Sequence, residues 1–201
     1  MPTLQIEKSL WNSGYKLIAG IDEVGRGCFA GSVVAGAVIF PPTVKLPKGI
    51  ADSKLLKPKL REELSLIIQD LSLFWAVGEA SVEEINKVGI GKATQIAFKR
   101  AVKALSSSPD FLLIDAFYID EFAKQVQRPV KNGDKICASI SAASIIAKVY
   151  RDGLMRGLSK KYPEYGFFEN KGYGTKFHRE AIKKHGLSRI HRTSFDLGKF
   201  L

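Results

Sequence analysis

The sequence has few of the side chains that build disulfide frameworks or zinc sites. It holds only two cysteines and three histidines in 201 residues. Cys28 and Cys137 are too few for a disulfide scaffold, and no Cys/His spacing typical of a zinc site is present. Such sparing use of cysteine suits a reducing cellular compartment. The chain also lacks internal repeats and low-complexity tracts, and its length fits one domain with a sizeable core.

Long hydrophobic runs are also missing. The longest apolar stretch, Gly31 to Phe40, is too short to span a bilayer. The N-terminal residues 1–16 lack the basic start and apolar run of a signal peptide. We therefore expect a cytoplasmic protein without a membrane partner.

Acidic residues are scarce relative to basic ones. The chain has 31 Lys and Arg against 20 Asp and Glu, a net charge of +11. Residues 151–201 hold 12 of the basic residues and only 5 acids, and they interleave them with aromatic rings. This composition is typical of a surface that binds a polyanion such as nucleic acid. A solvated basic helix with packing aromatics is the alternative interpretation of this subregion.

Hydrophobic periodicity predicts alternating strands and helices after an initial hairpin. This order indicates an α/β protein with a mixed sheet. The strands are expected at Tyr15–Val24, Ser32–Phe40, Ser72–Ala80 and Asp110–Ala116. One helix is expected with Pro58 in its first turn, and others at Val82–Lys87, at Gly91–Leu105 and over residues 139–158. Ser139 or Ser141 is a candidate N-cap of the last of these helices.

Carboxylates stand at the ends of two expected strands. Asp22 follows the apolar run KLIAGI, and Asp115 follows FLLI. Strand alternation points Asp22 and Glu23 to opposite faces unless the strand loses regularity at the glycine-containing turn that follows. Asp134 follows a glycine just before the serine-rich helix. Ligand sites commonly form at the carboxyl edge of such sheets, so these acids are candidates for one cluster.

Clustered carboxylates call for hard cations, because they repel one another unless a positive charge lies between them. Oxygen ligands favour Mg²⁺ or Mn²⁺. Together with a basic surface, such a cluster favours metal-dependent chemistry on a phosphodiester. Two ions would activate a water and stabilise the leaving oxygen.

Five motifs in order resemble the ribonuclease HII family of type 2 ribonucleases H. They are GIDEVGRGCFAG, DSK, LLID, GD followed by SISAASIIAKVYRD, and NKGYGTKFH, and together they run from about Leu17 to Phe195. The resemblance implies an RNase H-like fold in which a central mixed sheet is flanked by helices. It also implies one domain over residues 1–201, with the basic helical subregion 151–201 packed on it.

The resemblance implies a role for each matching residue. The catalytic and metal-binding residues would be Asp22, Glu23, Asp115 and Asp134. The substrate-binding residues would be Gly25, Arg26 and Gly27 at the ribose 2′-hydroxyl, Ser53 and Lys54 at a phosphate, and Tyr173 on the deoxyribose of an RNA-to-DNA junction. Lys148 and Arg151 lie three residues apart, so one helix face could offer both to phosphate, or the face is simply solvated.

The implied activity is a metal-dependent endoribonuclease. It would cut the RNA strand of RNA–DNA hybrids and at single ribonucleotides in duplex DNA, with Mn²⁺ or Mg²⁺, and leave 5′-phosphate and 3′-hydroxyl ends. We expect a monomer, and the sequence reveals no replication-clamp partner. Two alternatives are a non-catalytic hybrid-binding protein and the sister type ribonuclease HIII, which usually carries an extra N-terminal domain.

The chain departs from the family pattern at three positions. Cys28 replaces a common proline, Leu55 a common lysine, and Gly89 a common asparagine. None of these affects the acids, although the last puts one phosphate contact in doubt. The three histidines, His178, His185 and His191, have no partner at ligand spacing and receive no role.

Overall fold

The computed structural model describes residues 1–47, 49–50 and 56–200. Ser53 and Lys54 therefore lie outside the described residues. The sheet has five strands in the order β3-β2-β1-β4-β5, so it is mixed as expected. β1 pairs antiparallel with β2 and parallel with β4. The strands are β1 (Ile18–Val24), β2 (Val33–Ile39), β3 (Phe74–Ala80), β4 (Phe111–Asp115) and β5 (Gln127–Val130).

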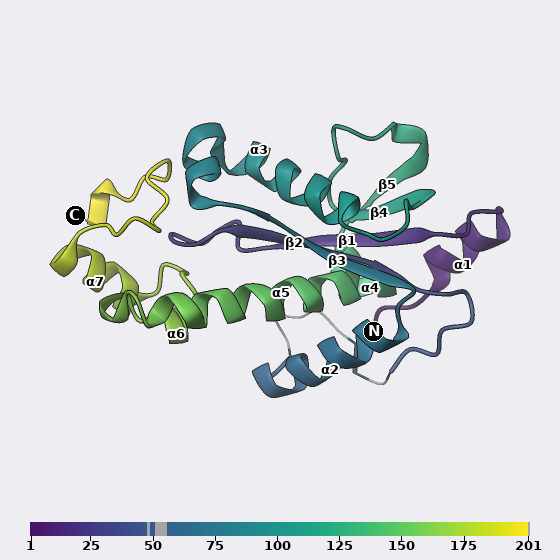
Figure 1. Ribbon diagram of the computed structural model, residues 1–201, viewed down its shortest axis with the longest axis horizontal. Coiled ribbons are helices and arrows are strands. Elements are labelled where there is room, and N and C mark those ends of the chain that lie inside the picture. The colour runs from purple at the N-terminus through teal and green to yellow at the C-terminus, as the bar shows by residue number, and fades with distance from the viewer. Residues whose placement is uncertain (48, 51–55, 201) are drawn as a thin grey trace.

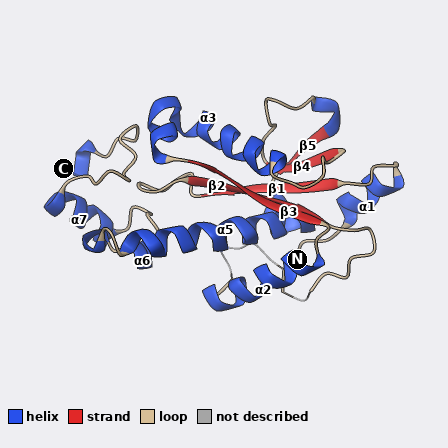
Figure 2. Ribbon diagram, viewed as in Figure 1, coloured by secondary structure: helices blue, strands red, loops and turns tan. Residues whose placement is uncertain are grey.

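Helices cover both faces of the sheet. One face is covered by α3 and the other by α5, while α2 packs on α5 (Figures 1 and 2). The α-helices are α1 (Gln5–Asn12), α2 (Pro58–Leu71), α3 (Val82–Lys103), α4 (Gly133–Ile136), α5 (Ala138–Ser159), α6 (Phe167–Asn170) and α7 (Lys176–His185). Short 3₁₀ helices are η1 (Lys124–Val126), η2 (Pro163–Tyr165) and η3 (Gly198–Phe200). None of the described helices is long and apolar enough to cross a membrane.

Helix α5 packs closely against the central strand β1. A side chain at Gly20 would place its Cβ 2.2 Å from the carbonyl carbon of Ser139. Glycine therefore lets the helix approach β1 at backbone distance. Every residue of β2 is buried, in agreement with the continuous apolar run that predicted this strand.

Several local expectations differ from the structure. The two helices expected at 82–87 and 91–105 are nearly continuous and are separated by a kink at Gly89, where φ is 78°. Helix α5 begins at Ala138 without a side-chain cap. Ser139 instead donates its N–H and hydroxyl to the carboxylate of Glu7 from α1. The apolar pattern did not predict α1 or β5.

The C-terminal helices α6 and α7 lie at the end of the molecule where β1 turns into β2 (Figure 1). The N–H of Phe29 donates to the carbonyl of Gly172 at 2.8 Å, and the N–H of Arg192 donates to the carbonyl of Phe29 at 2.8 Å. The basic C-terminal segment contains helices, as expected. The two hydrogen bonds attach it to the β1–β2 turn.

Candidate active site

Strand register places two of the predicted acids side by side. The parallel pairing of β1 with β4 ends at Ile21 opposite Ile114. Asp22 and Asp115 are the next residues on the two strands, and partners in a parallel ladder project to the same face. Asp22 lies two residues after Gly20, which faces α5, so both carboxylates project on the α5 side of the sheet.

The carboxylate of Asp22 is buried, with 4% of the residue exposed. It accepts a hydrogen bond from the N–H of Glu23 at 2.7 Å and another from the hydroxyl of Ser144. Burial, reinforced by the nearby Glu23 and Asp115 charges, raises the pKa of Asp22 well above its usual value. A neighbouring cation would stabilise the ionised form of such a carboxylate. Sequence reasoning missed Ser144, which lies on the face of α5 that packs on the sheet.

Glu23 lies at the rim of the same cluster. Strand β1 stays regular through Val24, so the strand does not break before the glycine-containing turn. The Glu23 charge nevertheless raises the pKa of Asp22, so the two carboxylates interact. One carboxylate oxygen, Oε1, is 3.5 Å from Nη1 of Arg26. The other, Oε2, is buried and has no hydrogen-bond partner in the part of the chain that the structure describes. Burial raises the pKa of Glu23, and Arg26 opposes this.

The start of α4 connects Asp115 to the segment that carries Asp134. The N–H of Gly133 donates to Oδ1 of Asp115 at 2.7 Å. This bond ties the end of β4 to the residue before Asp134, which is itself buried with 5% exposed. Two acids 19 positions apart are thus held at one edge of the sheet, as the strand-end pattern predicted.

The predicted turn at residues 25–27 is anchored from the C-terminal region. Gly25 has φ of 96°, a backbone conformation that favours glycine. The buried guanidinium of Arg192 donates to the carbonyls of Arg26, Gly31 and Ser32. Sequence reasoning missed Arg192, because composition counted it as part of an exposed basic surface.

Tyr173 lies beside the same turn, and its ring is half-buried with 38% of the residue exposed. Burial, reinforced by the neighbouring Cys28 thiol, raises the pKa of Tyr173 to about 12. Nζ of Lys148 is 5.6 Å from the ring centroid and forms an ion pair with Asp152 at 2.6 Å. Tyr173 and Lys148 are therefore close together.

Arg151 is placed differently from the expectation. It is fully buried, and its guanidinium donates to the carbonyls of Ser32, Lys171 and Ala30. Each of its three nitrogens donates to a main-chain carbonyl. The side chain therefore connects α5 to the loop at residues 30–32 and to the loop at Lys171. The proposed phosphate contact of Arg151 does not agree with this placement, because the guanidinium has no exposed surface.

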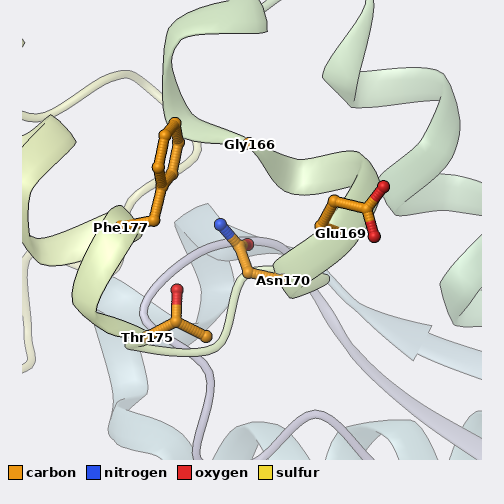
Figure 3. A pocket seen from close by; sticks show the side chains of 5 residues that line it. All are labelled: Gly166, Glu169, Asn170, Thr175 and Phe177. Carbon is orange, nitrogen blue, oxygen red and sulfur yellow. The ribbon is translucent and has the colours of Figure 1, made fainter.

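Two hollows lie near these residues. One of about 310 Å³ is lined by Arg26 and Phe117, whose ring lies 4.6 Å from the guanidinium, and by Lys92 of α3. Another of about 400 Å³ lies behind the Tyr173 loop and is lined by Gly166, Glu169, Asn170, Thr175 and Phe177. Figure 3 shows the Glu169 carboxylate turned away from the other side chains of this second hollow. None of the predicted acids lines either hollow.

The donor set fits a hard divalent cation, although its geometry is not that of a closed metal site. The acids offer only oxygen ligands, and the buried Oε2 of Glu23 has no hydrogen-bond partner within residues 1–47, 49–50 and 56–200. Within the part of the chain that the structure describes, no three His, Cys, Asp or Glu side chains are arranged to hold an ion. Asp22 and Asp115 each direct an oxygen at a backbone N–H instead.

A family model for ribonuclease HII matches residues 19–197, the span that contains every one of these acids. The chain belongs to the ribonuclease HII family. A ribonuclease HII of Alkaliphilus oremlandii (strain OhILAs) is 50% identical over 207 residues, which cover all of both chains. This family membership makes the protein an endoribonuclease of the ribonuclease H type and confirms that part of the prediction.

Solved structures agree with this assignment. The ribonuclease H2 of Pyrococcus horikoshii superposes with a TM-score of 0.74 at 25% identity, covering 91% of this chain and 95% of that one. A Bst ribonuclease HIII in complex with Mn²⁺ superposes with a TM-score of 0.72 at 20% identity, over 92% and 69% of the two chains. The second likeness shows the shared fold alone, whereas the sequence match identifies the ribonuclease HII family.

Proposed function

We propose that the chain cuts the RNA strand of RNA–DNA hybrids and also cuts at single ribonucleotides within duplex DNA. Asp22, Glu23, Asp115 and Asp134 would hold divalent cations, Mn²⁺ or Mg²⁺, for this reaction. The proposal is supported by the buried Oε2 of Glu23, which has no hydrogen-bond partner among the residues that the structure describes. The Glu23 charge also raises the pKa of the buried Asp22. An unpaired buried carboxylate oxygen is costly unless a cation completes its environment.

Divalent cations bound by these acids would activate the attacking water and stabilise the leaving oxygen. The side chains contribute a fixed set of oxygens. Ser144 and the N–H of Glu23 orient the carboxylate of Asp22, and the N–H of Gly133 orients that of Asp115. Orientation by neighbours of this kind is typical of residues that ligate metals.

We assign substrate recognition to two loops, the turn at residues 25–27 and the loop that carries Tyr173. The turn of Gly25, Arg26 and Gly27 would bring backbone groups to the ribose 2′-hydroxyl, the group that distinguishes RNA from DNA at one nucleotide. The half-exposed ring of Tyr173 would stack on the deoxyribose at the next position, with Lys148 beside it for a phosphate. Ser53 and Lys54 remain proposed phosphate contacts outside the described residues.

Substitution of two acids tests this proposal. We expect Asp22→Asn and Asp115→Asn to lose nearly all cleavage while keeping wild-type circular dichroism, because asparagine preserves shape and removes a ligand charge. Binding of the same duplex should be unchanged or tighter, since less negative charge faces phosphate. Turnover near that of the wild type in either variant would refute the assignment of the acids.

A further inference from the structure

Two buried histidines near the active site take no part in the mechanism proposed above. His178 lies in the first turn of α7, and His191 lies in the segment that bridges to Ala30. Both are essentially inaccessible, with 0% and 1% exposed, and their Nε2 atoms are 3.0 Å apart. The rings of Tyr165 and Phe167 pack against them, with ring centroids 4.8 Å from His191 and 5.2 Å from His178.

The partners of the two rings allow only one arrangement of protons. The N–H of Ser188 can only donate, and it contacts Nδ1 of His191 at 2.9 Å, where the Ser188 hydroxyl at 2.8 Å can donate as well. His191 therefore carries its proton on Nε2 and donates it to Nε2 of His178. His178 then carries its proton on Nδ1 and donates it to the carbonyl of Tyr173 at 2.9 Å. We call this chain of three hydrogen bonds, from Ser188 through both histidines to Tyr173, the histidine relay.

The relay ends on the main chain of the residue proposed to stack on the substrate. The carbonyl of Tyr173 accepts from the N–H of Thr175 at 2.8 Å as well as from His178. Both of its lone pairs are used, which fixes the orientation of this peptide group. Asn170 secures the other side of the loop, because its Oδ1 accepts from the N–H of Gly172 at 2.8 Å.

The neighbouring residue reaches the other substrate loop. Arg192 directly follows His191 and donates to the carbonyl of Arg26 at 2.7 Å. Two consecutive residues of one segment thus hold the loop proposed to read DNA and the turn proposed to read RNA. A histidine pair kept only for packing would not need this directional polar chain, since an apolar ring would fill the same space.

We propose that His178 and His191 are positioning residues that set the Tyr173 ring for an RNA-to-DNA junction by fixing the Tyr173 carbonyl. The proposal rests on the function proposed above for Tyr173. Burial lowers the pKa of His178, and burial together with the neighbouring ring lowers the pKa of His191 to about 4. Both rings are therefore neutral at ordinary pH, as the relay requires.

A matched pair of variants at position 178 separates positioning from packing. His178→Asn places an amide N–H where Nδ1–H stood, so it keeps the bond to the Tyr173 carbonyl. His178→Gln places its terminal amide where Nε2 stood, so it keeps a bond to His191 and loses Tyr173. Both variants lose one hydrogen bond and a ring. His185→Gln, at an exposed position on the same helix, controls for the loss of a histidine.

The readout is kcat/KM on a duplex with one ribonucleotide, divided by kcat/KM on a continuous RNA–DNA hybrid. We expect His178→Gln to lower this ratio about tenfold, within the range of a lost stacking contact, with the change mainly in KM. His178→Asn and His185→Gln should stay within about twofold of wild type, because the contact to Tyr173 is kept. Equal losses on both substrates, or equal ratios for the two position-178 variants, would overturn the proposal.

A double-mutant cycle with Tyr173→Ala tests whether His178 acts through Tyr173. In the Tyr173→Ala background, His178→Gln should leave the ratio unchanged, and a further decrease would contradict the relay. If His178→Gln does not fold, His191→Asn serves in its place, because it keeps an acceptor for Ser188 and removes the donor to His178. That variant should lower the ratio, and an unchanged ratio would contradict the proposal.

Imidazole ¹⁵N chemical shifts test the relay without any cleavage. The wild type should show Nδ1–H at His178 and Nε2–H at His191, and the opposite tautomers would refute the relay directly. If the tautomers are as expected but Tyr173→Ala leaves the ratio unchanged, the function proposed for Tyr173 is wrong, and the positioning proposal that rests on it is overturned. An altered ratio in Tyr173→Ala without an effect of His178→Gln would refute positioning alone.

Discussion

Oδ1 of Asp115 accepts a hydrogen bond from the N–H of Gly133 at 2.7 Å, and this bond joins two acidic segments that are distant in sequence. It connects the last residue of β4 with the first residue of α4, and Asp134 follows at once. The acidic edge of the sheet is therefore built by the main chain before any cation binds.

Metal binding should stabilise the folded protein. Mn²⁺ bound by the acids stabilises the folded state over the unfolded chain, so the wild-type Tm should rise by several degrees on addition of the ion. Asp115→Asn should lose most of this rise, while Asp196→Asn, at a side chain 84% exposed, should keep it. Differential scanning fluorimetry measures both, and an equal rise in all three proteins would contradict the metal assignment.

Asp152 should be a major determinant of stability. Its carboxylate forms ion pairs with Arg61 at 3.2 Å and Lys148 at 2.6 Å, and all three side chains are nearly buried. Asp152→Asn removes the carboxylate from both nearly buried ion pairs, which should cost about 3 kcal/mol of unfolding free energy. Urea denaturation measures this cost.

The matched control is an exposed ion pair between the same two helices, α2 and α5. Glu62 pairs with Arg156 at 2.7 Å, but both side chains are more than a third exposed. Glu62→Gln should therefore change the unfolding free energy by less than about 1 kcal/mol. Similar losses in Asp152→Asn and Glu62→Gln would mean that burial does not set the strength of these pairs.

Arg151 should act on stability and not on phosphate binding. A lysine cannot reproduce the three hydrogen bonds that its guanidinium makes to buried carbonyls, so Arg151→Lys should cost about 2 kcal/mol or more. The slope of log affinity against log salt for an uncleaved duplex should stay unchanged. A slope reduced by about one, with full stability, would restore Arg151 as a phosphate contact.

The sequence predicted the acids better than it predicted their supports. Asp22 and Asp115 could be found because a carboxylate after an apolar run marks a strand end. The burial of Arg151 and Arg192 could not, because a local pattern does not distinguish an arginine bonded to buried carbonyls from one in solvent. Strand β5 was missed because Arg128 and Pro129 interrupt its short run. The histidine relay was missed because its partners lie 13 residues apart and meet only through the fold.

The histidine relay should make stability depend on pH. A histidine in the unfolded chain binds a proton near pH 6.5, whereas burial keeps the folded pKa of His191 at about 4 and lowers that of His178. The unfolded state therefore gains protons first as pH falls, so this stability is complete above pH 6.5 and is lost toward pH 4.

The comparison for this effect is the double variant His178→Gln/His191→Gln, which lacks both groups. Carboxylates titrate alike in the two proteins and cancel in the difference. Between pH 7.5 and pH 5, the wild type should lose about 2 kcal/mol of unfolding free energy relative to the variant for His191 alone. A difference that does not change with pH would show that the folded rings titrate normally.

The most direct test of the central claim uses duplex DNA that contains one ribonucleotide, and it reads the product ends. We expect cleavage only with Mn²⁺ or Mg²⁺, with 5′-phosphate and 3′-hydroxyl ends, because an activated water attacks the phosphorus. Cleavage that persists in chelator, or products that end in a 2′,3′-cyclic phosphate, would contradict it, since the ribose 2′-hydroxyl would then be the nucleophile.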